Sequence, residues 1–238
     1  MKVDVALLPT LIAVESLPSK NVVVFDVLRA TTSMTAALSA GITEIRIFDT
    51  LDAASTAAKA HPGKRLLCGE TKCLTPPGFD LGNSPRAFQS IQHAGQTMFL
   101  STTNGTRAIV ASRGARRLLV GAIVNAAAVA RELASDASDV LLVCAGTNGE
   151  IAWEDALGAG AVIQELSTIA SVELESDSAR MSQALFRNAS SDLVAVLRDC
   201  RGGRNVIAAG LSEDIDFAAR LNVFNRVGVV EDHPLRAV

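Results

Sequence analysis

Residues 21–59 read NVVVFDVLRATTSMTAALSAGITEIRIFDTLDAASTAAK, and this stretch decides the fold. Two short apolar runs, NVVVFDV and EIRIFD, alternate with Ala-rich segments of helical composition. Continuous apolar runs of this length are typical of buried parallel strands, and the segments between them are typical of crossover helices. The pattern predicts an α/β protein with a mostly parallel sheet.

A second stretch, residues 96–134, repeats this order of elements. When the two stretches are aligned, Gly41 corresponds to Gly114 and Asp52 corresponds to Asn125. Asp52 and Asn125 are each predicted to cap a helix. Another strand follows each copy, RLLCGE in the first and VLLVCAG in the second. The sequence therefore predicts a single unit, 1–238, with two similar halves, about 1–95 and 96–238. Duplication and shared α/β patterning explain the likeness equally well.

Composition excludes several classes of protein. The chain is 49% hydrophobic, which is enough for a large core, and 25 acidic against 22 basic residues give a net charge of −3. This charge provides no field that attracts nucleic acid or an anionic membrane. The N-terminus lacks signal-peptide features, no apolar run is long enough to span a membrane, and the four cysteines form no CxxC pair. We expect a cytoplasmic protein, as a monomer or a homodimer.

The first candidate site is VVVFDVLRATTS, where a carboxylate ends an apolar strand. Ligands of open parallel sheets bind beyond the carboxyl ends of the strands, where such turns gather. Asp26 is a candidate ligand of a divalent cation, and Arg29, Thr31 and Thr32 are candidates for binding phosphate oxygens at the start of a helix. In the alternative interpretation, Asp26 accepts hydrogen bonds from the loop and Thr31 caps the helix.

The second candidate is CGETKCLTPPGFDLGNSP. Glu70 follows a buried strand, as Asp26 does, so two acidic groups are expected at the same edge of the sheet. They are tolerated there when a metal ion or a proton lies between them, and hard oxygen ligands suit magnesium. Asn83 is a candidate for substrate binding, although Asn beside Gly and Pro also forms ordinary turns.

Two further segments complete the predicted site. In STTNGTRAI, amide and side-chain donors of a Gly-containing turn form a candidate anion nest, or else an ordinary Asn-Gly turn before a capped helix. Its candidate residues are Thr103, Asn104, Gly105, Thr106 and Arg107. In CAGTNGEIAWEDALGAG, Asp155 opens a helix, where the helix dipole favours acidic residues; it can also complete a metal site or act as a base.

Together these four segments resemble the 2-phosphosulfolactate phosphatase family. The matching stretches are VVVFDVLRATTSMTAAL, GE followed by PPGFDLGNSP, TTNGTRA and CAGTNGEIAWEDALGAG, with a weaker match in GRNVIAAGLSEDIDFAARL. The resemblance spans most of the chain in the right order. One departure is ETKCLTPPGFD, because similar sequences carry a glycine-rich stretch before GFD.

The resemblance implies a three-layer α/β/α fold and a magnesium-dependent phosphatase. Its implied reaction is the hydrolysis of 2-phospho-3-sulfolactate to 3-sulfolactate and phosphate in coenzyme M biosynthesis. We expect a small anionic phosphorylated substrate, with neither nucleic acid nor membrane as partner. Our hypothesis makes Asp26, Glu70 and Asp155 the catalytic, metal-binding residues, with Arg29 and Arg107 gripping anionic groups.

Three alternatives remain open from the sequence. One is a phosphatase of another small phospho-carboxylate, and another is a sensor that binds an anionic metabolite without chemistry. The third is a haloacid-dehalogenase-type phosphatase with Asp26 as nucleophile. The third ranks lowest, because Leu28 occupies the position where that family carries its acid and base.

Overall fold

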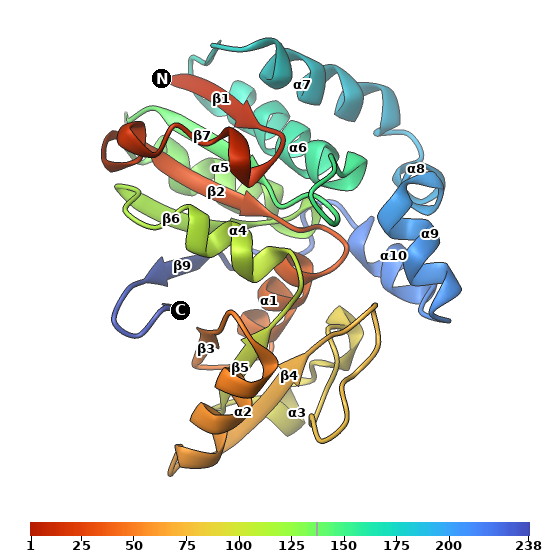
Figure 1. The fold of residues 1–238 in the computed structure, drawn as a ribbon. Coiled ribbons are helices and arrows are strands. Elements are labelled where there is room, and N and C mark those ends of the chain that lie inside the picture. Colours follow the sequence, from red (N-terminus) through yellow and green to blue (C-terminus); the bar gives the residue numbers. More distant parts are fainter. Residues whose placement is uncertain (137) are drawn as a thin grey trace.

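Ten strands and ten α-helices are present in the computed structural model, which describes residues 1–136 and 138–238 (Figure 1). The strands are β1 (Lys2–Ala6), β2 (Asn21–Phe25), β3 (Glu44–Ile47), β4 (Arg65–Gly69), β5 (Thr97–Ser101), β6 (Arg117–Gly121), β7 (Val140–Cys144), β8 (Glu173–Leu174), β9 (Gly228–Glu231) and β10 (Arg236–Ala237). The helices are α1 (Ala30–Ser39), α2 (Leu51–Ala60), α3 (Ser90–His93), α4 (Gly105–Ala111), α5 (Ala126–Ala134), α6 (Trp153–Ile169), α7 (Asp177–Ala189), α8 (Leu193–Asp199), α9 (Arg201–Ala208) and α10 (Glu213–Ala218).

All ten strands belong to one sheet, in the order β4-β5-β3-β10-β9-β6-β2-β7-β1-β8. Six of the nine pairings among the described residues are parallel. The three antiparallel pairings all involve the hairpin β9–β10. The predicted mostly parallel α/β fold is therefore confirmed. The hairpin divides the sheet into two parallel parts, the β5 sub-sheet (β4-β5-β3) and the β2 sub-sheet (β6-β2-β7-β1-β8).

The two repeats of the sequence exchange their first strands. Strand β2 begins the first repeat, yet it lies between β6 and β7 of the second, with Val22 opposite both Leu118 and Leu141. Strand β5 begins the second repeat and lies between β3 and β4 of the first. Each sub-sheet is thus built from strands of both repeats.

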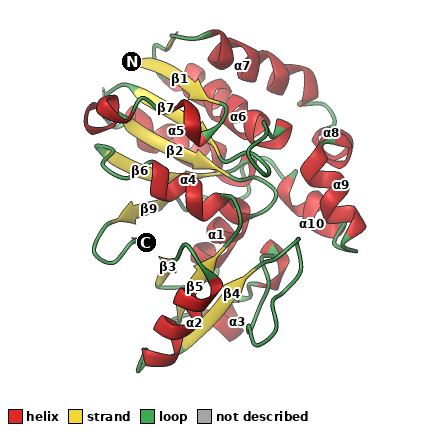
Figure 2. Cartoon of the chain, viewed as in Figure 1, coloured by secondary structure: helices red, strands yellow, loops and turns green. Residues whose placement is uncertain are grey.

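Helices cover both faces of the sheet, which explains the continuous apolar strands (Figure 2). Val23 and Phe25 of β2 are fully buried among side chains of α5 and α6. Val22 and Val24 point to the opposite face, among side chains of α1 and α4. Each such side chain contributes roughly 1.5–3 kcal/mol of hydrophobic stabilisation. A strand buried on both faces needs no polar positions, and the layers form the predicted three-layer α/β/α fold.

The C-terminal third contains helices α7 to α10, followed by the hairpin β9–β10. Helices α8, α9 and α10 pack beside the carboxyl end of the β2 sub-sheet (Figure 1). All four cysteines are unpaired. None of the helices in residues 1–136 and 138–238 combines the length and hydrophobicity needed to cross a membrane.

Candidate active site

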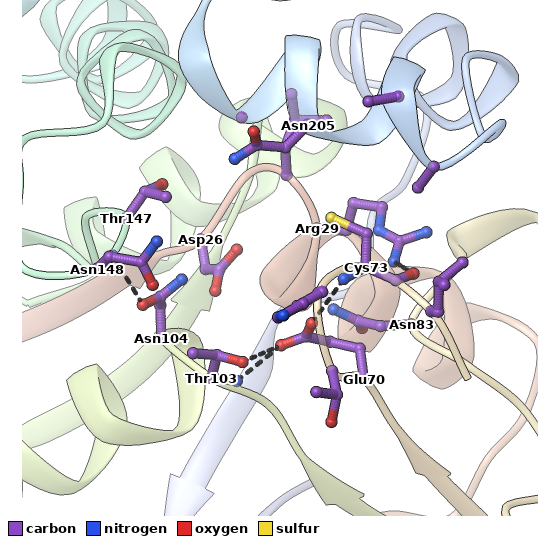
Figure 3. Close-up of a pocket in the computed structure, with 17 residues that line it drawn as sticks. Asp26, Arg29, Glu70, Cys73, Asn83, Thr103, Asn104, Thr147, Asn148 and Asn205 are labelled. Atoms are coloured by element: carbon purple, nitrogen blue, oxygen red, sulfur yellow. Dashed lines mark hydrogen bonds between the residues drawn. The ribbon is translucent and has the colours of Figure 1, made fainter. Parts of the chain in front are cut away.

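A cavity of about 690 Å³ lies where the predicted turns meet (Figure 3). Asp26 follows β2, Glu70 follows β4, Thr103 follows β5 and Thr147 follows β7, so strand ends of both sub-sheets contribute. Helix α9 adds a wall from the C-terminal region. The lining residues are Asp26, Leu28, Arg29, Glu70, Thr71, Lys72, Cys73, Leu74, Asn83, Thr103, Asn104, Thr147, Asn148, Gly202, Asn205, Ala208 and Ala209.

Asp26 lies at the centre of this arrangement. Its Oδ1 accepts a hydrogen bond from the Ala30 amide (3.1 Å), and its own amide donates to Thr31 Oγ1 (3.0 Å). Burial raises the pKa of the Asp26 carboxyl to about 6, and the charge of Glu70 adds to this rise, while the Ala30 and Gly105 amides oppose it. Asp26 can therefore change its protonation near neutral pH.

Gly105 allows the β5–α4 turn to approach Asp26. A Cβ atom at this position would lie 2.6 Å from the Ala30 Cβ and 2.8 Å from Asp26 Oδ2, both shorter than real contacts. Gly105 therefore has a packing role here. It brings the two strand-end turns together.

Glu70 fastens two loops of the cavity wall. Its Oε1 accepts hydrogen bonds from the amide and the hydroxyl of Thr103 (2.8 and 2.6 Å), and its Oε2 accepts one from the Cys73 amide (3.0 Å). These bonds are drawn in Figure 3. Glu70 thus joins the turn after β5 to the turn of residues 71–74, which we call the Lys72 turn.

Asp155 has the equivalent function in the other half of the site. Its Oδ1 accepts a hydrogen bond from the Val27 amide (2.8 Å), and its Oδ2 accepts one from the Gly146 amide (3.0 Å). Burial raises the pKa of Asp155 well above its ordinary value, and Asp26 and Glu154 add to the rise. Asp155 was predicted to share a metal ion with Asp26, but the structure buries it outside the cavity lining.

The turns of the site are related in pairs. Thr71 and Leu74 exchange two backbone hydrogen bonds (3.0 and 3.1 Å), and Thr147 and Glu150 do the same (2.8 and 3.1 Å) in what we call the Asn148 turn, residues 147–150. The bond from Ala30 to Asp26 also has a counterpart, from the Thr106 amide to Thr102 Oγ1. Equivalent hydrogen bonds therefore recur in the turns that form the walls of the cavity.

Arg29 is held by a buried ion pair. Its Nη1 donates to Asp214 Oδ2 (2.6 Å), and its Nη2 donates to the Cys73 carbonyl (2.6 Å). Both side chains of the pair are almost fully buried. Ser84 donates to the other oxygen of Asp214 (2.6 Å). Arg29 lines the cavity, but much of its charge is balanced by Asp214.

Four asparagines place amide groups around the cavity. Asn83 follows the long loop after β4, Asn104 ends the turn after β5, Asn148 lies on its own turn and Asn205 projects from α9 (Figure 3). The backbone N–H of Asn148 donates to Asn104 Oδ1 (3.3 Å). Asn83 Oδ1 is buried without a hydrogen-bond partner among the described groups. An unpaired buried acceptor is costly, so a ligand that pairs with it is favoured.

The remaining predicted binding residues lie behind the cavity wall. Thr31 and Thr32 are buried at the start of α1, where the Thr32 hydroxyl donates to the Val27 carbonyl (2.8 Å). Thr106 donates to the Thr102 carbonyl (2.7 Å), and Arg107 is exposed outside the lining. The Thr32 and Thr106 hydroxyls support the turns. None of these four side chains belongs to the described cavity wall.

Two of the three predicted metal ligands fit a magnesium ion. Asp26 and Glu70 both line the cavity, and their carboxylate oxygens keep acceptor capacity beyond the bonds described above. In the described parts of the chain, no three His, Cys, Asp or Glu side chains form a metal-binding group. Magnesium often binds through one or two carboxylates and completes its shell with water and phosphate oxygens. Asp155 does not fit, because its buried carboxyl lies outside the cavity lining.

Several lining residues were not predicted from the sequence. Asn148 had a signal, because its Thr-Asn-Gly sequence repeats that of Thr103 to Gly105. Asn205 and the buried partner Asp214 both lie in GRNVIAAGLSEDIDFAARL, where only a weak match was noted. Lys72 lies in the segment that departs from the glycine-rich pattern. Long-range packing brings all of them to the site.

Comparison with known proteins shows similarity along most of the chain. The family model of 2-phosphosulpholactate phosphatase matches residues 6–233. A protein of Carboxydothermus hydrogenoformans is 39% identical over 95% of this chain and 92% of its own length. Relatives from Deinococcus radiodurans (38% identical, 84% and 82% covered) and Gloeobacter violaceus (37% identical, 93% and 92% covered) are similarly close. All three carry the name probable 2-phosphosulfolactate phosphatase.

The matched region contains strands β2 to β9, every turn that lines the cavity and helix α9. The chain therefore belongs to the 2-phosphosulpholactate phosphatase family, a family of phosphoric monoester hydrolases.

Proposed function

We propose that this chain hydrolyses 2-phospho-3-sulfolactate to 3-sulfolactate and phosphate, as a magnesium-dependent cytoplasmic enzyme of coenzyme M biosynthesis. The observation that carries the proposal is the cavity, in which Asp26 and Glu70 lie beside Arg29, Lys72 and four asparagine amides. This mixture suits an anionic phosphoester. The names of the relatives support the choice of substrate.

Asp26 and Glu70 would hold the magnesium ion, which when bound supplies positive charge to the phosphoryl oxygens. Without a cation, the two carboxylates would repel an anionic ligand, and the charge of Glu70 raises the pKa of Asp26 for the same reason. Glu70 keeps its geometry through Thr103 and Cys73. The fastened loops therefore present both carboxylates without reorganisation.

The amide and cationic side chains orient the substrate. Asn83, Asn104 and Asn148 offer neutral donors that can pair with phosphoryl, carboxylate or sulfonate oxygens. Arg29 fixes the Cys73 carbonyl and Asp214, so its main role is to hold the wall in place. Water in the cavity is the simplest nucleophile. Asp26 as a nucleophile would leave a phosphorylated peptide, which a phosphate mimic and peptide mapping would detect.

Phosphate release tests the proposed function. The purified chain is incubated with 2-phosphosulfolactate or 2-phospholactate, with magnesium or with EDTA. We expect release that depends on magnesium and is fastest for phosphosulfolactate. Asp26→Asn and Glu70→Gln should each lower kcat roughly 100-fold, while Asp52→Asn, an exposed residue of α2, should not. Circular dichroism verifies that each variant is folded.

Other outcomes identify the alternatives. Faster turnover of 2-phospholactate would favour a phosphatase of another small phospho-carboxylate. Binding of phosphosulfolactate without release would favour a sensor. Full activity in EDTA would refute the magnesium requirement.

A further inference from the structure

The cavity contains one cation without a protein partner. Arg29 and Lys72 are the basic side chains of the lining, and Arg29 is paired with Asp214. Lys72 forms neither a hydrogen bond nor an ion pair with any of the described residues, and it is exposed to solvent. Its charge is therefore available to a ligand.

Lys72 occupies a conformation that its side chain does not favour. Its φ angle is 51° and that of Cys73 is 68°, both in the left-handed region. A tight turn with two such residues favours Asn-Gly, and the equivalent Asn148 turn has Asn148 (φ 54°) followed by Gly149 (φ 79°). A non-glycine residue in this region costs on the order of 1–2 kcal/mol. The Lys72 turn therefore has the unfavourable sequence Lys-Cys at these two positions, whereas the equivalent Asn148 turn has the favourable sequence Asn-Gly.

The backbone of the Lys72 turn is fixed on both sides. The Cys73 amide donates to Glu70, and the Cys73 carbonyl accepts from Arg29 (2.6 Å). The two bonds between Thr71 and Leu74 close the turn. The base of the Lys72 side chain is thus held beside Glu70, while its ammonium group can adapt to a ligand.

We propose that Lys72 determines substrate specificity in this chain, by binding the acid group that the substrate carries next to its phosphoryl ester. This inference rests on the proposed function and names the substrate class, a phosphoester with a carboxylate or sulfonate on a neighbouring carbon. An ammonium group suits this role, because it is a compact charge with three donors that can follow a tetrahedral or planar acid group. The unfavourable turn sequence is retained because it supplies this charge.

The variant Lys72→Asn separates binding from folding. It restores the Asn preferred by the turn, so its melting temperature should equal or exceed that of the wild type. Calorimetry then measures the Kd of 3-sulfolactate, of lactate and of inorganic phosphate. We expect the Kd of 3-sulfolactate to rise roughly tenfold or more, as for a lost charge-assisted hydrogen bond. The Kd of inorganic phosphate, which lacks the second acid group, should change less than twofold.

Two further variants complete the test. Lys72→Arg keeps the charge and should retain most of the affinity for 3-sulfolactate. Lys64→Asn makes the same change of charge at an exposed residue outside the cavity and should bind like the wild type. Loss of lactate binding would assign Lys72 to the carboxylate, and loss confined to 3-sulfolactate would assign it to the sulfonate.

The inference is overturned if Lys72→Asn binds 3-sulfolactate as tightly as the wild type, if its affinity for phosphate falls equally, or if the wild type binds no 3-sulfolactate. These results differ from failure of the proposed function, which appears as absence of phosphate release from phosphosulfolactate by the wild type. Calorimetry evaluates Lys72 in either case.

Discussion

Asp26 couples the protonation of the site to the stability of the fold. Its pKa rises from 3.8 to about 6 on folding, mainly because the carboxyl is buried. Folding therefore favours the protonated form, so this stabilising contribution is complete below pH 3.8 and is lost as the pH rises through 6. At higher pH, the charged form of Asp26 lowers the free energy of unfolding by at most about 3 kcal/mol.

Asp26→Asn should reveal this cost in the absence of metal. The neutral amide is isosteric, so we expect the free energy of unfolding in EDTA to match that of the wild type near pH 4 and to exceed it at pH 8. Urea denaturation at both pH values measures the difference. A difference independent of pH would contradict the raised pKa. Asp52→Asn serves as the control at an exposed position.

The pair of Arg29 and Asp214 should contribute far more to stability than an exposed pair on the same helix. Asp214→Asn leaves a buried guanidinium without its counter-charge, which typically costs about 3–5 kcal/mol. Asp216→Asn removes the half-exposed bond to Arg198 and should cost less than about 1 kcal/mol. Chemical denaturation compares the two variants. Equal losses would show that the buried pair is weak.

Gly202 allows helix α9 to pack closely over the cavity. A Cβ atom at Gly202 would lie 1.8 Å from Glu154 Oε1, a buried carboxyl at the start of α6. Because Asn205 lies one turn later on α9, a displaced helix would also change the cavity wall.

Gly202→Ala should therefore lower the melting temperature and weaken the binding of 3-sulfolactate. Arg201→Ala, next to it on the exposed side of α9, removes only a surface ion pair with Glu150 and is the matched control. An unchanged melting temperature for Gly202→Ala would indicate that Glu154 moves aside without cost.

The elements of the fold were easier to predict than their pairing. Apolar runs such as NVVVFDV identified the central strands, because a strand covered on both faces has a distinctive composition. Helix starts were less certain. Asp52 was predicted to cap α2, but Thr50 caps it by accepting a bond from the Ala53 amide (3.1 Å). The place of β9 and β10 in the middle of the sheet was not predictable, since it depends on partners more than 100 residues away.

In the site, the positions of residues were likewise easier to predict than their functions. Asp26, Glu70, Arg29, Asn83, Thr103 and Asn104 all line the cavity, because strand-end turns gather wherever parallel strands end together. The separate functions of Asp26 and Asp155 could not be read from their sequences. Both are acidic residues in segments that follow a strand. Only the folded structure shows that Asp155 accepts hydrogen bonds from the Val27 and Gly146 amides, whereas Asp26 faces the cavity.

The exchange of β2 and β5 makes the two halves of the chain interdependent. A fragment of residues 1–95 lacks β5, the central strand of its own sub-sheet, and a fragment of residues 96–238 lacks β2. Unpaired strand edges would make each fragment prone to aggregate. Co-expressed, the two should assemble into an active complex, measured by phosphate release after co-purification. Independent folding of either fragment, seen by circular dichroism, would contradict this expectation.

The paired turns around the cavity also have a stereochemical consequence. Their backbone hydrogen bonds are alike, yet one turn presents Lys72 to the cavity and the other presents Asn148. The two related turns thus carry chemically different walls. A substrate whose central carbon bears two different arms meets a different neighbour on each side. The enzyme is thereby equipped to distinguish mirror-image forms of its phosphoester, because the side chains of the two turns differ.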